Sequence, residues 1–136
     1  MLDTNMLGYI VRGRSMTACS RFLHLTEHET ACISSITEAE ILYGLAKCPA
    51  ATRLRTLMEE LLRKIEVLPF DSEAALHYGT MRAGLEAKGT SLENMDMLIA
   101  AHAAAVNAVL VTNDKAFRRV DGLIVDMNWA TDLKTY

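Results

Sequence analysis

The sequence predicts an α/β fold of three layers (α/β/α), in which a central parallel sheet of about five short strands lies between two layers of helices. Short apolar or β-branched runs alternate with longer helical runs along the chain. Four of the five short runs are uniformly apolar, which is typical of strands buried on both faces of a parallel sheet. The length of 136 residues suits one domain, so we expect a single domain over residues 1–136.

Five segments are the strand candidates. In chain order they are Met1–Asp3, Ala31–Ser34, Glu66–Phe70, Ala108–Thr112 and Leu123–Asp126. The first is very short, because only two residues precede Asp3. Open α/β sheets place their functional sites beyond the carboxyl ends of their strands. That edge of the sheet is therefore where a site is expected.

Helical patterns separate the strands. Leu54–Ile65 carries apolar residues at the i, i+3, i+4, i+7 spacing of an amphipathic helix. Ser72–Lys88 is expected to be a second long helix that ends at Gly89, and Asn94–Val106 is rich in the strong helix former Ala. A capping box in Ser35–Glu38 is expected to begin the helix that follows the second strand.

Composition narrows the class of protein. Apolar residues make up 51% of the chain and charged residues 23%, which excludes an intrinsically disordered protein. A net charge of -3 excludes a strongly basic nucleic-acid clamp but leaves room for a local basic patch. The three cysteines cannot all pair within the chain, so we expect reduced thiols in the cytoplasm. No signal peptide is expected, and Met97–Val111, the longest apolar run, is too short to span a membrane.

Four carboxylates are expected at the carboxyl edge of the sheet. Asp3 ends the first strand, and Glu40 lies early in the helix after the second. Asp96 lies near the start of the Ala-rich helix, and Asp114 follows the fourth strand. Taken singly, the three aspartates also fit structural roles as a helix cap, a partner of the helix dipole and a turn residue. Glu40 is not needed for capping, and no Lys or Arg lies within one helical turn of it.

Repulsion between these carboxylates bears on what they do. Two carboxylates about 4 Å apart repel each other by about 4 kcal/mol at an effective dielectric constant near 20. Four clustered acids would therefore take up protons or bind cations. Mg²⁺ and Mn²⁺ prefer carboxylate and water oxygens. If the four acids converge, a divalent metal site is the simplest explanation.

Four segments of the chain carry a recognisable series. They read LDTN at 2–5, ISSITEAEILYG at 33–44, DMLIAAH at 96–102 and LVTND at 110–114, the last followed by Phe117. Together they resemble the PIN domain and, more narrowly, the VapC toxins of bacterial toxin–antitoxin pairs. The resemblance implies a PIN-like α/β/α fold and a divalent-metal-dependent endoribonuclease. It also assigns the acidic residues of the site, which are Asp3, Glu40, Asp96 and Asp114. The supporting polar residues that it implies are Thr4, Asn5 and Thr112.

The resemblance also implies partners. The cofactor would be Mg²⁺ or Mn²⁺, and the substrate an RNA such as a tRNA or rRNA loop, cleaved to leave 5′-phosphate and 3′-hydroxyl ends. A VapB-type antitoxin would cover the acidic groove, and the toxin would form a homodimer and assemble with its antitoxin into a heterotetramer or larger complex. The candidate RNA-binding cations are Arg12, Arg14, Lys115, Arg118 and Arg119.

Two other functions compete with this one. In the first, the acidic pocket chiefly docks a partner and catalysis is weak or missing. In the second, His24, Glu27 and His28 match the H-x-x-E-H pattern of a zinc metalloprotease. That pattern requires both histidines on one helix face, but the helix must end before Ala31 and no third ligand is evident. The remaining candidate, His102, is expected to pack rather than catalyse.

Overall fold

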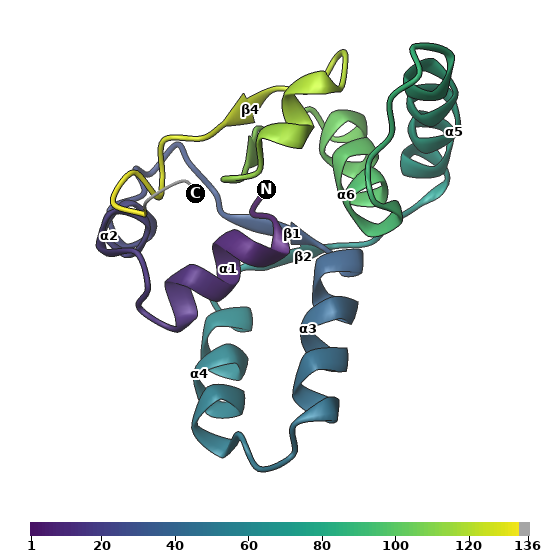
Figure 1. The fold of residues 1–136 in the computed structure, drawn as a ribbon. Helices are drawn as coiled ribbons and strands as arrows, with labels where there is room; N and C mark the ends of the chain where they lie inside the picture. Colours follow the sequence, from purple (N-terminus) through teal and green to yellow (C-terminus); the bar gives the residue numbers. More distant parts are fainter. Residues whose placement is uncertain (134–136) are drawn as a thin grey trace.

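A computed structural model describes residues 1–133 of the chain (Figure 1). Six α-helices and a short 3-10 helix, η1, cover these residues together with four short strands. The helices are α1 (Thr4–Val11), α2 (Met16–Leu23), α3 (Ser35–Lys47), α4 (Thr52–Leu62), α5 (Ser72–Ala87), α6 (Asn94–Ala105) and η1 (Lys115–Arg119). The strands are β1 (Cys32–Ser34), β2 (Glu66–Leu68), β3 (Leu110–Val111) and β4 (Val125–Asp126).

The strands form two parallel pairs that Leu2 joins. β1 pairs with β2, and β3 pairs with β4. The backbone N–H of Leu2 donates to the carbonyl of Cys32 at 2.9 Å, and Leu2 forms a parallel bridge with Val111. The strand order is therefore β2, β1, Leu2, β3, β4, and the pairs β1–β2, Leu2–β3 and β3–β4 are parallel. The predicted first strand, Met1–Asp3, is thus reduced to a single bridging residue.

Neighbouring residues of each strand bury their side chains in different cores. Leu2, Ile33 and Val111 belong to one apolar cluster, together with residues of α1, α2, α3 and α4. Their chain neighbours Met1, Cys32 and Leu110 belong to a second cluster, with residues of α5, α6 and η1. Because side chains alternate between the two faces of a strand, this division places one helical layer on each face. The predicted three-layer α/β/α fold is confirmed.

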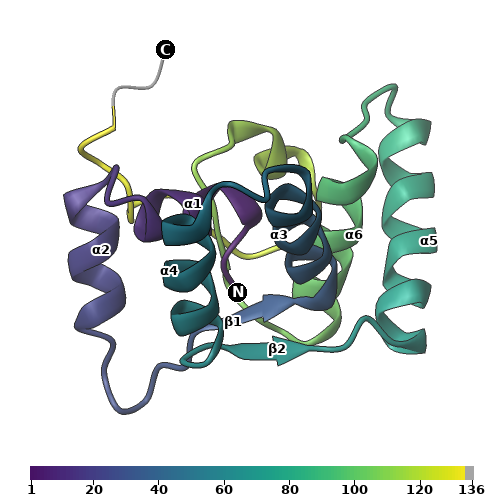
Figure 2. The ribbon, with the colours of Figure 1, turned by 90° about the horizontal axis from the view of Figure 1, so that it is seen from below.

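The helices follow the sequence patterns closely. α5 begins after Asp71, whose carboxylate accepts a hydrogen bond from the N–H of Ala74 at 3.0 Å. Gly89 follows its end with a positive φ of 70°, a conformation that favours glycine. α5 packs along α6, as Figure 2 shows at one end of the molecule. No helix within residues 1–133 has the length and apolar character needed to cross a membrane.

The start of α3 differs from the prediction by one residue. Ser34, not Ser35, is the N-cap, and its hydroxyl accepts from the N–H of Ile36 at 3.0 Å. Ser35 instead accepts from the N–H of Phe70 at 3.0 Å, which ties α3 to the chain after β2. The capping box predicted at Ser35–Glu38 is therefore wrong. The strand residue Ser34 turns directly into the helix, so no spacer separates strand from cap.

Candidate functional site

Asp3 lies at the end of the Leu2 bridge and caps α1. Its side chain is only 4% exposed. One carboxylate oxygen accepts from the N–H of Met6 at 2.6 Å, and the other accepts from the hydroxyl of Thr112. The same residue therefore both caps a helix and presents a carboxylate at the carboxyl edge of the sheet. The two roles considered for Asp3 are compatible.

Burial dominates the ionisation of Asp3. It raises the pKa of the Asp3 carboxyl to about 6, against an ordinary value of 3.8. The hydrogen bonds from Thr112 and Met6 oppose this rise. The negative charges of Asp114 and Glu40 add to it. The site therefore holds a desolvated carboxylate that gains from a nearby cation.

Asp96 lies in the first turn of α6 and is partly buried. Burial raises its pKa to about 6 as well, and the charge of Glu93 is the next largest cause. The charges of the other three predicted acids add further to the rise. The charges of Asp3, Glu40 and Asp114 therefore reach Asp96, although burial and Glu93 act on it more strongly. Sequence reasoning missed Glu93, which is the N-cap of α6.

Two threonines hold these acids in place. Thr4, the first residue of α1, donates its hydroxyl to the carboxylate of Glu40 in α3. Thr112 is fully buried; it donates to Asp3 and accepts from the N–H of Asp114 at 3.0 Å. The threonines thus join α1 to α3 and the end of β3 to the start of α1. Both were predicted as supporting polar residues.

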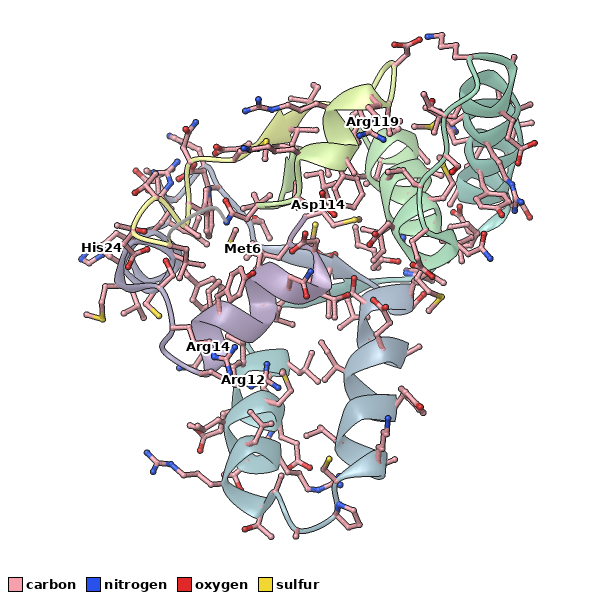
Figure 3. The ribbon with its side chains drawn as sticks, viewed as in Figure 1. Met6, Arg12, Arg14, His24, Asp114 and Arg119 are labelled. Atoms are coloured by element: carbon pink, nitrogen blue, oxygen red, sulfur yellow. The ribbon has the colours of Figure 1, made fainter. Side chains whose placement is uncertain are left out.

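Asp114 completes the cluster from η1. Its carboxylate caps η1 by accepting from the N–H of Ala116 at 2.8 Å, and the residue is exposed. Figure 3 places Asp114 above the N-terminal end of α1. Asn5, in contrast, is exposed on the first turn of α1, and no side-chain hydrogen bond within residues 1–133 joins it to any of the acids.

Exposed cations lie on two sides of the acids. Arg12 and Arg14 follow α1, and Figure 3 shows them at the end of α1 remote from Asp114. Lys115, Arg118 and Arg119 lie on η1. All five are exposed, and none of the salt bridges within residues 1–133 involves them.

The zinc pattern lacks the helix it requires. α2 ends at Leu23, so His24 is its C-cap and Glu27 and His28 lie in a turn beyond it. The ring nitrogen Nδ1 of His24 lies 2.8 Å from the carbonyl oxygen of Ser20. The two histidines therefore do not share a helix face, and the metalloprotease alternative is rejected.

The arrangement of the acids suits an open metal site. Within residues 1–133, no three His, Cys, Asp or Glu side chains stand close enough together to form a ready-made metal cage. Mg²⁺ rarely needs one, because it keeps several of its waters and binds through one or two carboxylates together with substrate phosphates. The four acids are of the kind that such a site uses. Asp3 is buried and Asp96 partly buried, and no Lys or Arg within residues 1–133 bonds to any of the four.

Comparison with known proteins gives a consistent result. The PIN domain family matches residues 1–123. Ribonuclease VapC2 of Rickettsia felis is 37% identical over 95% of this chain and 96% of its own length. The tRNA(fMet)-specific endonuclease VapC of Salmonella typhimurium is 37% identical over 93% of this chain and 95% of its own.

Solved structures agree with the sequence relatives. The crystal structure of VapBC2 from Rickettsia felis, bound to a DNA fragment from their promoter, superposes with a TM-score of 0.87 at 35% identity. The alignment covers 93% of this chain and 96% of that one. DNA-bound VapBC from Salmonella typhimurium superposes with a TM-score of 0.84 at 37% identity, over 93% of this chain and 95% of that one. The chain therefore belongs to the PIN domain family and, within it, to the VapC ribonucleases.

Proposed function

We propose that this protein is an endoribonuclease toxin that hydrolyses RNA with the help of a divalent metal ion and is neutralised by a VapB-type antitoxin. The observation that carries the site assignment is geometric: Thr112 bonds to both Asp3 and Asp114, and Thr4, the residue after Asp3, bonds to Glu40. The acids proposed as the catalytic centre are Asp3, Glu40, Asp96 and Asp114.

In this proposal Asp3 and Asp96 would bind Mg²⁺ or Mn²⁺ directly. Glu40 and Asp114 would bind the ion directly, hold its waters or complete a second metal position. A bound divalent ion lowers the pKa of a coordinated water and stabilises charge on the scissile phosphate. The contribution of the chain is to hold the carboxylates in place, through Thr112 at Asp3 and Thr4 at Glu40.

RNA binding falls to the exposed cations on the two sides of the acids. A net charge of -3 would otherwise repel a polyanion, so a local basic surface is needed. Lys115, Arg118 and Arg119 follow Asp114 directly along η1, while Arg12 and Arg14 lie beyond the far end of α1. We propose a tRNA as the substrate, because a relative 37% identical to this chain is named as a tRNA(fMet)-specific endonuclease. An rRNA loop is the competing target, and sequencing RNA ends after brief expression distinguishes the two.

Two glutamates on the same helix test the catalytic assignment. Glu40→Gln should reduce RNA cleavage by about a hundredfold or more, because it removes a charged acid from the centre. Glu38→Gln should leave cleavage unchanged, since the side chain of Glu38 makes no hydrogen bond or ion pair within residues 1–133. The measurement is the initial rate of cleavage with Mg²⁺ or Mn²⁺ and with chelator. Equal losses in the two variants would contradict the assignment, and no cleavage by the unaltered protein would favour the binding-module alternative.

The second test concerns partners. Apolar side chains exposed on α3 and α5, such as Leu42, Tyr43 and Leu76, support a homodimer.

The four acids favour an antitoxin that inserts an Arg, whose guanidinium pairs with carboxylates and competes with a metal. We expect a small antitoxin encoded by the adjacent gene to co-purify with this protein and to inhibit RNA cleavage. Degradation of the antitoxin should restore cleavage. A monomeric mass in light scattering would contradict the proposed homodimer. If cells that express this protein without an antitoxin grow normally, the proposed toxin function would be contradicted.

A further inference from the structure

His102 makes a buried polar link between two helices that carry site acids. It lies on α6, six residues beyond Asp96, and is only 1% exposed. Its Nδ1 lies 2.8 Å from the hydroxyl oxygen of Ser34, which is fully buried at the start of α3. Within residues 1–133 this is the one side-chain hydrogen bond that joins α6 to the β1–α3 unit. The proposed catalytic mechanism does not use either residue.

The hydroxyl of Ser34 determines the direction of this bond. Its oxygen already accepts from the N–H of Ile36 as the N-cap of α3. Its proton then needs an acceptor, and Nδ1 of a neutral imidazole protonated at Nε2 supplies one. The neutral form is favoured because burial lowers the pKa of His102, against a smaller opposing effect of Asp71. Ser34 therefore donates to His102 while it caps α3.

A third contact fixes the imidazole ring. The ring of Phe70 meets His102 edge-on, with the centroids 5.5 Å apart and the planes at 80°. The N–H of Phe70 donates to the hydroxyl of Ser35. The residue whose ring contacts His102 is thus bonded through its backbone to the first turn of α3. Together these contacts join α6, α3 and the chain after β2.

We infer that His102, through Ser34, is a positioning residue that sets the carboxylate of Glu40 relative to that of Asp96. Glu40 lies six residues after Ser34, and Asp96 lies six residues before His102. Six residues of helix span about 9 Å, so a small shift or rotation at the link is carried to both acids. Within residues 1–133, the side-chain hydrogen bond at Glu40 comes from Thr4, and that bond reaches α1 rather than α6. This inference rests on the proposed function.

Two amide substitutions separate the hydrogen bond from the bulk of the side chain. In His102→Asn the amide group reaches the place of Nδ1 and can bond to Ser34. In His102→Gln the amide group reaches the place of Nε2 and cannot replace that bond. We expect His102→Asn to keep kcat within about threefold and His102→Gln to lose about tenfold or more, since misplacement of about 1 Å can cost a hundredfold. KM should change little, because neither residue is expected to contact RNA.

A coupled variant and a stability control complete the test. In a Ser34→Ala background, where the bond is already absent, His102→Gln should lower kcat no further. Leu85→Ala removes a buried side chain from the same cluster as α6 without touching the link, so it should lower Tm yet keep kcat well below the unfolding transition. Equal kcat for the Asn and Gln variants, or losses of kcat that follow Tm alone, would overturn the inference. Should the His102 variants fail to fold, Ser34→Ala against Ser34→Thr tests the same bond from its other end.

The outcome is separable from that of the proposed function. Cleavage by the unaltered protein and its loss in Glu40→Gln test the catalytic centre without reference to His102. If those hold and the His102 variants behave alike, only the positioning role is wrong. If the unaltered protein fails to cleave, the proposed function is wrong as well.

Discussion

Asp3→Asn should abolish RNA cleavage and at the same time stabilise the metal-free protein. The loss of cleavage follows from removing a proposed metal ligand, and we expect it to exceed about a hundredfold. The gain in stability follows from burial, because the Asp3 carboxylate is 4% exposed and its pKa is raised to about 6. Asn is as good a helix N-cap as Asp, so the start of α1 is retained.

The sign and size of the stability change follow from the two pKa values of Asp3. The folded protein holds the Asp3 proton up to a pH of about 6, whereas an unfolded chain releases it near 3.8. Ionisation of Asp3 therefore destabilises the fold as the pH rises from 4 to 6, by about 3 kcal/mol when complete. The asparagine loses about 1 kcal/mol, since it cannot accept from both Met6 and Thr112 as the carboxylate does. The net gain expected above pH 6 is about 2 kcal/mol, and it should turn into a loss of at most about 1 kcal/mol at pH 4 and below, where only the hydrogen-bond loss remains.

Thermal unfolding in chelator across this pH range measures the effect. We expect Asp3→Asn to unfold several degrees above the unaltered protein at pH 7.5, and slightly below it near pH 4. Added Mg²⁺ or Mn²⁺ should raise the Tm of the unaltered protein, because a ligand of the folded state alone stabilises it. The variant should show a smaller rise. A variant less stable than the unaltered protein at pH 7.5 would show that the Asp3 charge is already compensated by the fold.

The layers of the fold could be predicted because their signal is local. Uniformly apolar runs such as Ala108–Thr112, alternating with helical patterns, are enough to indicate a parallel sheet covered on both sides. The lengths of the strands could not be predicted in this way. The first strand is reduced to Leu2 because Asp3 caps a helix that begins at Thr4. Because Asp3 is used to cap α1, residues 1–3 cannot form a longer strand.

The four proposed acids could be named from the sequence because the PIN-like motifs carry them, whereas the residues that support them could be named only in part. Thr4 and Thr112 lie next to motif residues, and both bond to predicted acids. The bond between Ser34 and His102 joins residues 68 positions apart, and no local pattern indicates it. The sequence placed His102 in the interior but could not show what it contacts there. Only the packing of α6 against β1 and α3 reveals its partner.

Phe117→Ala should have the largest effect on stability. Phe117 lies on η1, three residues after Asp114, and is 1% exposed in the cluster it shares with Ile99 and Leu110. Truncating a buried phenylalanine to alanine typically costs about 3–5 kcal/mol. That is a large part of the 5–15 kcal/mol or so by which a domain is stable. We therefore expect Phe117→Ala to unfold far below the unaltered protein, and Phe117→Leu to lose much less.

The same substitution bears on the site, because Phe117 is the buried residue of η1 and Asp114 caps that helix. Loosening η1 should free Asp114, so cleavage should fall even at temperatures where Phe117→Ala remains folded.

The neighbouring Arg118 is exposed, and Arg118→Ala should change the free energy of unfolding by no more than about 0.5 kcal/mol. If η1 binds RNA, Arg118→Ala should instead raise KM, and more so at low salt, where phosphate contacts are strongest. Urea unfolding and cleavage rates of the two variants provide the comparison. Full activity in Phe117→Ala despite its lower stability would contradict this role of η1 and would show that Thr112 is enough to hold Asp114.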